Sequence, residues 1–302
     1  MDTDTKSEVK ENDPTNNRSW VATYDSHFGV PISNWNTRAD GPVTELPDGV
    51  ADEKPIISVI DLYNELAVDG KDELDSKEIK FFEILDKEFK DVPEVRQKLG
   101  DMYADYGIIL KSSPASSKIH YHNCYLGGYI DHVINVYENA LRLTQVMKKS
   151  IGECMLTYSR KELVMAALHH DLWKLGDPSI RESYYVYQTS DWHRIKMQSL
   201  FMHNPRLPEM TVPDGSFYIL QLYNISLSYN TWISIKLSDG MYDNSNHAYY
   251  KSFAKYPMHS NLPYIIHWAD HLSSVAERSP LVDMFLNELQ LTGKSPTRIA
   301  MI

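Results

Sequence analysis

The middle of the chain carries apolar residues at every third or fourth position, which is the spacing of amphipathic helices. Segments 57–67, 74–89 and 92–106 show this pattern with charged residues between the apolar ones, and Pro93 suits the first turn of the third segment. The same spacing predicts further helices, at 127–147, 160–170, 189–202, 214–226 and 261–278. The chain is therefore predicted to be mostly helical.

Capping residues mark the starts of two of these helices. Ser159 is followed three positions later by Glu162, the pair that forms a capping box. Asn261 followed by Pro263 indicates the start of the last helix. Few segments alternate apolar and polar residues, and irregular loops are expected at 177–188, 203–213 and 239–260. We predict an all-α fold, a helical bundle with an irregular N-terminal arm.

Pattern and composition together divide the chain into five parts. Residues 1–18 are polar and charged without an aromatic residue, which predicts a disordered tail. Residues 19–55 mix aromatic residues with Gly and Pro, and we expect an irregular arm that packs its rings on the body of the protein. Residues 56–110 are expected to form helices that pack on the main domain at 111–290, and a C-terminal tail follows at 291–302.

The bulk composition restricts the class of protein. A chain of 302 residues, 42% hydrophobic and 24% charged, is long enough to bury a sizeable core. Its two cysteines, Cys124 and Cys154, make no disulfide framework, which indicates a reducing compartment. The N-terminus lacks the apolar run of a signal peptide, and no apolar run reaches the length of a membrane span. We therefore expect a soluble, cytoplasmic protein.

The net charge of −11 bears on the partners. Binding along a nucleic-acid backbone draws on clustered Lys and Arg, so a long nucleic acid is disfavoured, and no membrane partner is expected. A nucleotide or another phosphorylated small molecule stays open, because a bound divalent metal would supply local positive charge. A homo-oligomer is also left open.

The candidate chemistry begins with the neighbours His170 and Asp171. Adjacent residues of a helix point about 100° apart, so they reach one metal ion only where the helix ends and the chain turns around the ion. Gly176 and Pro178 place such an end just downstream. An imidazole beside a carboxylate suits Mn²⁺, Fe²⁺, Zn²⁺, Ni²⁺ or Mg²⁺.

Two residues from other helices can join this pair. His132 falls at the edge of the apolar face of its predicted helix, so its ring can point inward. Asp270 lies in a helix that is otherwise largely apolar on one side. A buried carboxylate needs a partner, because an unpaired buried charge is costly, and a metal is one such partner. A hydrogen-bonded core Asp or a helix-surface Asp is the alternative.

These four residues and the sequence around them resemble the HD superfamily of metal-dependent phosphohydrolases. GGYIDHVINV has a Gly pair before His132, ALHHDLWKLGD has Lys174 three residues after Asp171, and IIHWADHLSSVAE has an alanine before Asp270. The resemblance covers about residues 112–278. The chain is most similar to HD-domain proteins found in large bacteriophages, and more distantly to the HD domain of a 3′–5′ exoribonuclease family.

The resemblance implies a role for each of these residues. It implies that His132, His170, Asp171 and Asp270 hold one divalent ion, with Mn, Mg, Fe, Ni, Co and Zn as the candidates. It gives Asp171 and Lys174 catalytic roles, with Lys174 binding phosphate. A solvated surface lysine is the alternative for Lys174.

One position departs from the pattern of the family. Members often carry a Gly where this chain has Trp173, directly before the lysine of the motif. A bulky ring there would either bind substrate by stacking on a base or pack in the core. Both interpretations stay open.

Other residues extend the candidate site. His120 and His122 lie two apart and would face the same side of an extended segment, where they would contact substrate phosphate. His193 is a further candidate catalytic residue, and Arg194 beside it is a candidate phosphate contact.

Several neighbours of the motif have plainer roles. Relatives with two metals carry a His pair where this chain has Ser-Asp at 238–239, so a second metal would depend on Asp239. His169 and His267 adjoin predicted ligands and are candidate partners of them. Asp177 is most simply a helix-terminal Asp.

The leading hypothesis is a divalent-metal-dependent phosphohydrolase that acts on a nucleotide, as a nucleotidase or a nucleoside triphosphate hydrolase. A 3′–5′ exonuclease-type phosphodiesterase is one alternative. Another is an HD-type di-iron oxygenase, which would require His193 or His203 as extra ligands. A third is a non-catalytic binding protein, against which the intact ligand set and Lys174 argue.

Overall fold

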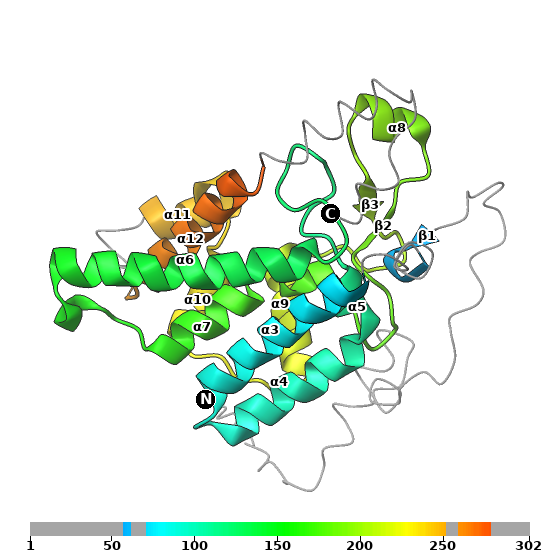
Figure 1. The fold of residues 1–302 in the computed structure, drawn as a ribbon. Coiled ribbons are helices and arrows are strands. Elements are labelled where there is room, and N and C mark those ends of the chain that lie inside the picture. Colours follow the sequence, from blue (N-terminus) through cyan, green and yellow to red (C-terminus); the bar gives the residue numbers. More distant parts are fainter. Residues whose placement is uncertain (1–56, 62–70, 252–258, 279–302) are drawn as a thin grey trace, which may run out of the picture. The chain divides into compact units, whose positions relative to one another are not determined.

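Helices make up most of the residues that this computed structural model describes, namely 57–61, 71–251 and 259–278 (Figure 1). The prediction of an all-α fold is therefore confirmed. The predicted tail, arm and C-terminal tail, at 1–18, 19–55 and 291–302, lie outside the described residues. Among the described helices, none has the length and apolar character needed to cross a membrane.

The core is built around α6 (Gly128–Ile151). Helix α6 packs against α12 (Leu262–Ala276) and α7 (Arg160–His169), and α10 (Tyr229–Lys236) packs on both of these partners. Figure 1 shows α6 running horizontally, with α12 above it and α7 below it. Their buried apolar side chains belong to one continuous hydrophobic cluster, so these helices hold one another in place.

The helix starts follow the predicted capping signals. The Ser159 hydroxyl accepts a hydrogen bond from the Glu162 N–H at 3.3 Å, and the Glu162 carboxylate accepts one from the Ser159 N–H at 2.7 Å, which confirms the capping box of α7. Helix α12 begins directly after Asn261 with Pro263 in its first turn. Both helices therefore start where the sequence indicates.

Helices α3 (Lys71–Phe89), α4 (Pro93–Tyr106) and α5 (Ile108–Ser112) pack together beside this core. Helix α3 also contacts α6 and α7. Phe81 of α3 and Tyr103 of α4 are fully buried, with their ring centroids 4.9 Å apart in an edge-to-face arrangement. The helices predicted at 74–89 and 92–106 are thus present, with the second beginning at Pro93.

A small antiparallel sheet was not predicted. It has the order β1 (Ile57–Ser58), β2 (Tyr185–Tyr187) and β3 (Phe201–His203). Phe201 pairs with Tyr187, and Ile57 pairs with the same residue from the other side. The prediction of helix at 57–58 and of loops at 185–187 and 203 was therefore wrong.

The helix predicted at 189–202 is also wrong beyond its first part. Helix α8 (Asp191–Lys196) is short, and Gln198 then adopts a left-handed backbone with φ of 52°. The Gln188 N–H donates to the Leu200 carbonyl at 2.9 Å, which joins the two arms around α8. Strand pairing depends on partners distant in the chain, so local apolar spacing did not reveal it.

The last third of the chain has shorter helices than predicted. Helix α9 (Val212–Leu222) ends at Leu222 rather than at 226, and α10 was not predicted. The segment predicted as a loop at 239–260 contains three short helical elements, η4 (Gly240–Tyr242), η5 (Asn244–Asn246) and α11 (His247–Lys251). Residues 252–258 of this segment lie outside the described residues.

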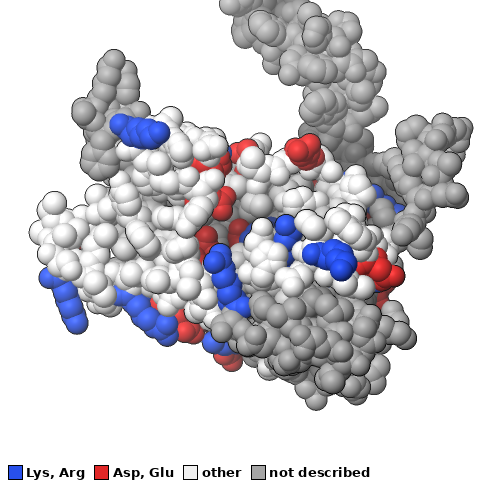
Figure 2. Space-filling model, turned by 90° about the horizontal axis from the view of Figure 1, so that it is seen from above, with Lys and Arg blue, Asp and Glu red and all other residues white. Residues whose placement is uncertain are grey.

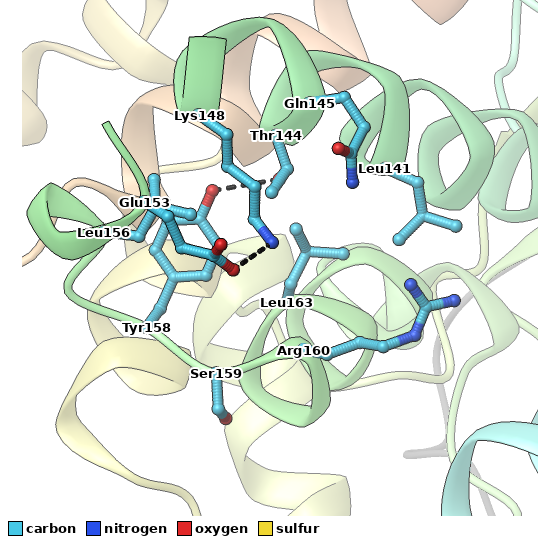
Figure 3. A pocket seen from close by; sticks show the side chains of 10 residues that line it. All are labelled: Leu141, Thr144, Gln145, Lys148, Glu153, Leu156, Tyr158, Ser159, Arg160 and Leu163. Atoms are coloured by element: carbon cyan, nitrogen blue, oxygen red, sulfur yellow. Dashed lines mark hydrogen bonds and ion pairs between the residues drawn. The ribbon is translucent and has the colours of Figure 1, made fainter. Parts of the chain in front are cut away.

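A cavity of about 360 Å³ lies between the second half of α6 and the start of α7 (Figure 3). Its lining contains the Lys148–Glu153 ion pair and the hydrogen bond between the hydroxyls of Thr144 and Tyr158. His132 lies nearer the other end of α6, about 18 Å from Thr144 at the rise of an α-helix. None of the predicted metal ligands lines this cavity.

One buried carboxylate ties three helices together. Glu88 of α3 accepts two hydrogen bonds from the Arg160 guanidinium of α7, both at 2.7 Å, and one from the Tyr137 hydroxyl of α6 at 2.8 Å. The Arg160 hydrogen bonds outweigh burial and hold the pKa of Glu88 below its ordinary value of 4.5. The ionised form of Glu88 therefore stabilises the folded protein.

Replacing Glu88→Gln should lower the free energy of unfolding at neutral pH by about 1–3 kcal/mol. Because the folded pKa is depressed, the stabilisation is present above pH 4.5 and is lost as the pH falls through the folded pKa. Urea unfolding at neutral pH and at about pH 4 checks this, and the deficit of the variant should shrink at the lower pH. Glu94→Gln, which removes an exposed carboxylate, is the control. Equal deficits at both pH values would contradict the interpretation.

Candidate metal centre

The structure brings together the four residues predicted as ligands. The Nε2 atom of His132, in α6, lies 3.4 Å from Asp171 Oδ2 and 3.2 Å from Asp270 Oδ1. The Nε2 atom of His170 lies 3.5 Å and 3.9 Å from the same two oxygens. His132, His170 and Asp171 are buried, and Asp270 is largely buried. Two imidazoles and two carboxylates from three helical segments thus converge on one point.

The end of α7 explains how neighbours can face one point. His170 still has helical backbone angles, whereas Asp171 has φ of −108° and ψ of 16° and begins the 3₁₀ turn η3 (Leu172–Leu175). The chain changes direction between the two residues, so their side chains are no longer 100° apart around a helix axis. This is the helix end that the sequence predicted.

Both histidines have their Nε2 atoms free of hydrogen bonds. The Nδ1 atom of His132 lies 2.9 Å from a carboxylate oxygen of Glu277, and that of His170 lies 2.9 Å from the Ala167 carbonyl oxygen. Since those oxygens only accept, each Nδ1 carries a hydrogen and donates it. Both Nε2 atoms are buried without a hydrogen-bond partner. In the neutral ring each Nε2 holds a lone pair, which is the tautomer that binds a metal.

The carboxylates around the histidines favour a positive charge at this point. Burial lowers the pKa of His132, but Asp171, Asp270 and Glu277 outweigh it and raise that pKa well above its ordinary value. Burial raises the pKa of Asp270, yet the two histidines outweigh it and hold that pKa well below the ordinary value. A proton or a metal ion satisfies this charge arrangement. The donor set of imidazole nitrogens and carboxylate oxygens fits a divalent transition metal or Mg²⁺.

Lys174 is an integral part of the cluster. Its ammonium lies 2.6 Å from Asp171 Oδ2, and its side chain is largely buried. Burial alone would lower the pKa of Lys174, but the charge of Asp171 outweighs burial and raises it, so the ammonium stays charged. Lys174 is therefore not the solvated surface lysine that was the alternative.

Sequence analysis missed Glu277 and its partner Asn135. Glu277 Oε2 faces His132 Nδ1, and Glu277 Oε1 accepts a hydrogen bond from the Asn135 amide at 2.8 Å. Glu277 follows Asp270 by seven residues, about two helical turns, and lies directly after the last residue of α12, on the same side of the helix as Asp270. That spacing is the signal that could have identified it. Its carboxylate fixes the ring orientation of His132.

His120 and His122 do not face the same way, contrary to the prediction. The Tyr121 N–H donates to the Lys118 carbonyl at 2.9 Å, so the segment is a turn rather than extended. His120 is exposed beside Tyr121, whereas the His122 ring lies 4.4 Å from the His132 ring. Burial and the nearby charges of His132 and Lys174 place the pKa of His122 well below its ordinary value. Only His122 joins the cluster.

His193 and Arg194 lie on α8, which stands apart from α6, α7 and α12 in Figure 1. His193 is exposed and its Nδ1 lies 2.9 Å from the Ser190 hydroxyl. Arg194 donates to the Gln188 carbonyl and to Asp191, and its guanidinium lies 5.2 Å from the Tyr187 ring centroid. The structure does not bring the candidate catalytic His193 or the candidate phosphate contact Arg194 to the cluster.

Trp173 is a core residue, which corrects the prediction that its ring binds substrate. It is 0% exposed, and its ring packs against Gly215 of α9 so closely that a Cβ there would lie 2.2 Å from ring atoms. The rings of Tyr184 and Tyr218 meet it edge-on. Because residue 215 is a glycine, the interface has room for the bulky Trp173 ring.

Asp177, His169 and His203, which lie near the motif or were considered as extra ligands, make structural contacts. Asp177 accepts from the N–H and hydroxyl of Ser179, which is a local turn contact. His169 turns toward the core, where its Nδ1 lies 2.8 Å from the Met165 carbonyl oxygen, and burial lowers its pKa to about 4. His203, on β3, packs beside Tyr184. The contacts of Asp177, His169 and His203 are thus with residues other than the four predicted ligands.

An aromatic row lies beside Asp270 on the outer side of α12. Tyr242 is 78% exposed, and its ring centroid lies 5.7 Å from that of His271 at an interplanar angle of 29°. His267, held by the Ser238 carbonyl at 2.8 Å, lies 6.2 Å from His271 in the same stacked sense. Tyr242, His267 and His271 therefore form a row of rings, of which Tyr242 is exposed and the two histidines are half-buried. The two histidines lie on either side of Asp270 in the sequence of α12.

Asp239 adds negative charge near this row. Desolvation by the surrounding protein and the negative charges of Asp171 and Asp270 raise the pKa of Asp239. The Asp239 carboxyl therefore interacts electrostatically with the cluster. Figure 2 shows Asp and Glu side chains in a band across the middle of one face, whereas Lys and Arg side chains lie scattered around it. No broad basic surface is visible on this face.

Comparisons with known proteins gave one partial match. No family model matches the chain, and no solved structure matches it. A stretch of 70 residues, 23% of the chain, is 36% identical to the dihydroneopterin 2′,3′-cyclic phosphate phosphodiesterase of Methanocaldococcus jannaschii. The match spans about a quarter (26%) of the length of that relative. The chain is therefore similar in part to a phosphodiesterase, and the resemblance to bacteriophage proteins stays a prediction.

Replacing Glu277→Gln should weaken metal binding about 10- to 100-fold, because the uncharged side chain no longer holds His132 in its ligating orientation as firmly. Titration of metal against a competing chelator, with circular dichroism to check folding, measures the change. Glu138→Gln, on the exposed side of α6, is the matched control. Equal affinity in Glu277→Gln and the control would refute the role of Glu277.

Proposed function

We propose that this chain is a divalent-metal-dependent phosphohydrolase that acts on a nucleotide. The observation that carries the proposal is the pair of unpartnered Nε2 atoms of His132 and His170, which face two ionised carboxylates. The charged Lys174 beside them adds a group suited to phosphate. The partial similarity to a phosphodiesterase supports a phosphoester or phosphoanhydride as the bond that is cleaved.

The residues of the cluster divide the chemistry among them. His132, His170, Asp171 and Asp270 would hold a divalent ion, which would supply Lewis acidity toward a phosphoryl oxygen and a water molecule. Glu277 orients His132 through Nδ1. Lys174, anchored on Asp171, balances negative charge on the phosphate, and this matters most in the transition state.

The row of Tyr242, His267 and His271 supports a substrate that contains an aromatic ring. A nucleobase stacks on exposed aromatic side chains, and such stacking contributes about 1–3 kcal/mol per base. The sequence suggested Trp173 as a stacking surface, but its ring is buried. The row of Tyr242, His267 and His271 would stack on the base instead. It flanks Asp270, so a base on the row would leave its phosphate close to the candidate metal centre.

A phosphodiesterase acting on a cyclic phosphate is a second candidate, favoured by the activity in the name of the similar protein. The di-iron hypothesis required His193 or His203 as ligands, and neither contacts the cluster in the described part of the chain. The cluster and Lys174 are intact, which argues against a binding protein without catalysis.

The test of the proposed activity is phosphate or pyrophosphate release. Nucleoside mono- and triphosphates, cyclic nucleotides and short oligonucleotides are incubated with Mn²⁺, Mg²⁺, Ni²⁺, Fe²⁺, Co²⁺ or Zn²⁺. We expect metal-dependent hydrolysis of a nucleotide, with kcat/KM reduced about 100-fold or more in Asp171→Asn and in Lys174→Met. Asp86→Asn, an exposed carboxylate of α3, should match the wild type. Absence of hydrolysis across the whole set in protein with bound metal would contradict the proposal.

Replacing Tyr242→Ala should raise KM for a nucleotide about tenfold while changing kcat little, because a stacking surface is lost away from the reacting bond. Hydrolysis of ribose 5-phosphate, which lacks a base, measures the phosphate end alone and should be unaffected. Tyr229→Ala removes an exposed tyrosine of α10 and serves as control. An equal rise in KM for both substrates would show that Tyr242 does not contact a base.

A further inference from the structure

The segment before α6 folds back over the first turn of that helix. The Ala115 N–H donates to the Asn123 carbonyl at 3.1 Å, and the Ser116 hydroxyl donates to the His122 carbonyl at 2.6 Å. A Cβ at Gly128 would lie 2.1 Å from the Asn123 carbonyl oxygen, so the close approach requires glycine. These contacts hold the backbone of His122 next to the start of α6.

The ring of His122 has no partner that explains its position. It lies 4.4 Å from the His132 ring, at an angle of 31°. Its Nε2 atom is buried and has no hydrogen-bond partner, and neither has Nε2 of His132. A buried ring nitrogen without a partner is unfavourable, and one that lies beside other candidate metal ligands points to an absent ligand.

The ring of His122 also brings a nitrogen close to two predicted metal ligands. Ligand atoms of His122, His132 and Asp171 are within 4.8 Å of one another, as are those of His132, His170 and Asp270. The two sets overlap at His132, whose Nδ1 is taken by Glu277 and whose only remaining donor atom is Nε2. An ion bound to His132 Nε2 therefore has donor groups of both sets around it.

We propose that His122 is a fifth protein ligand of the metal ion; this rests on the metal centre of the proposed function. A cation bound through the in-plane lone pairs of both rings would satisfy the bare Nε2 atoms of His122 and His132 at once. This role as a metal ligand replaces the phosphate contact that the sequence suggested for His122. Three imidazoles with two carboxylates favour Mn²⁺, Fe²⁺, Co²⁺, Ni²⁺ or Zn²⁺ over Mg²⁺, which prefers oxygen ligands.

The experiment measures metal binding to the full chain without substrate. Wild type, His122→Ala and His120→Ala are stripped with a chelator and titrated with Co²⁺, Ni²⁺ and Mg²⁺. We expect His122→Ala to weaken Co²⁺ and Ni²⁺ binding about tenfold or more, to weaken Mg²⁺ binding less, and to shift the visible absorption bands of bound Co²⁺. His120→Ala removes an exposed histidine of the same turn and should behave as the wild type.

A chemical rescue separates loss of a ligand from damage to the fold. In His122→Gly, free imidazole should enter the space of the missing ring and restore the Co²⁺ absorption of the wild type. Wild-type affinity and an unchanged spectrum in His122→Ala would overturn the proposal. The binding experiment contains no substrate, so its result is independent of the hydrolysis assay. Wild-type protein that binds Co²⁺ here but hydrolyses no nucleotide in that assay would contradict the proposed function alone. Wild-type protein that binds no Co²⁺ would overturn both.

Discussion

The buried carboxylates Asp171 and Asp270 set the constraint on which the arrangement of the central helices depends. Two negative charges that lie near each other inside a protein are costly unless cations or hydrogen-bond donors surround them. The Lys174 ammonium, 2.6 Å from Asp171, compensates part of this negative charge. The Nε2 atoms of His132 and His170 can compensate the rest only if a proton or a metal ion lies between them and the carboxylates. A divalent ion satisfies both carboxylates and both nitrogens together.

This constraint joins packing to chemistry. Helices α6, α7 and α12 meet through apolar side chains, and their polar groups gather at one place along that contact. Glu277 links the end of α12 to His132 of α6, so the same contact that closes the bundle also selects the tautomer of a candidate ligand. Glu88 performs a purely structural task of the same kind among α3, α6 and α7, without an unpartnered nitrogen nearby. The unpartnered Nε2 atoms of His132 and His170 are what distinguishes the Asp171–Asp270 site from the Glu88 site.

The sequence predicted features that depend on neighbours along the chain. The helix end at His170, the capping box at Ser159 and the inward ring of His132 follow from local spacing, and the structure contains all three. Features that depend on distant partners were missed. Trp173 is buried because Gly215 faces it, and β2 pairs with β1, which lies far away in sequence. His122 points inward because a turn at 118–121 replaces the extended backbone that its spacing suggested.

The most direct test of the central claim is the position of a metal in a crystal of the full chain grown with Mn²⁺, located by its anomalous scattering. The account predicts a peak within about 2–2.5 Å of the Nε2 atoms of His132 and His170 and of oxygens from Asp171 and Asp270. A peak bound by other residues, or no peak between these four side chains at saturating Mn²⁺, would contradict the claim that their convergence is a metal centre.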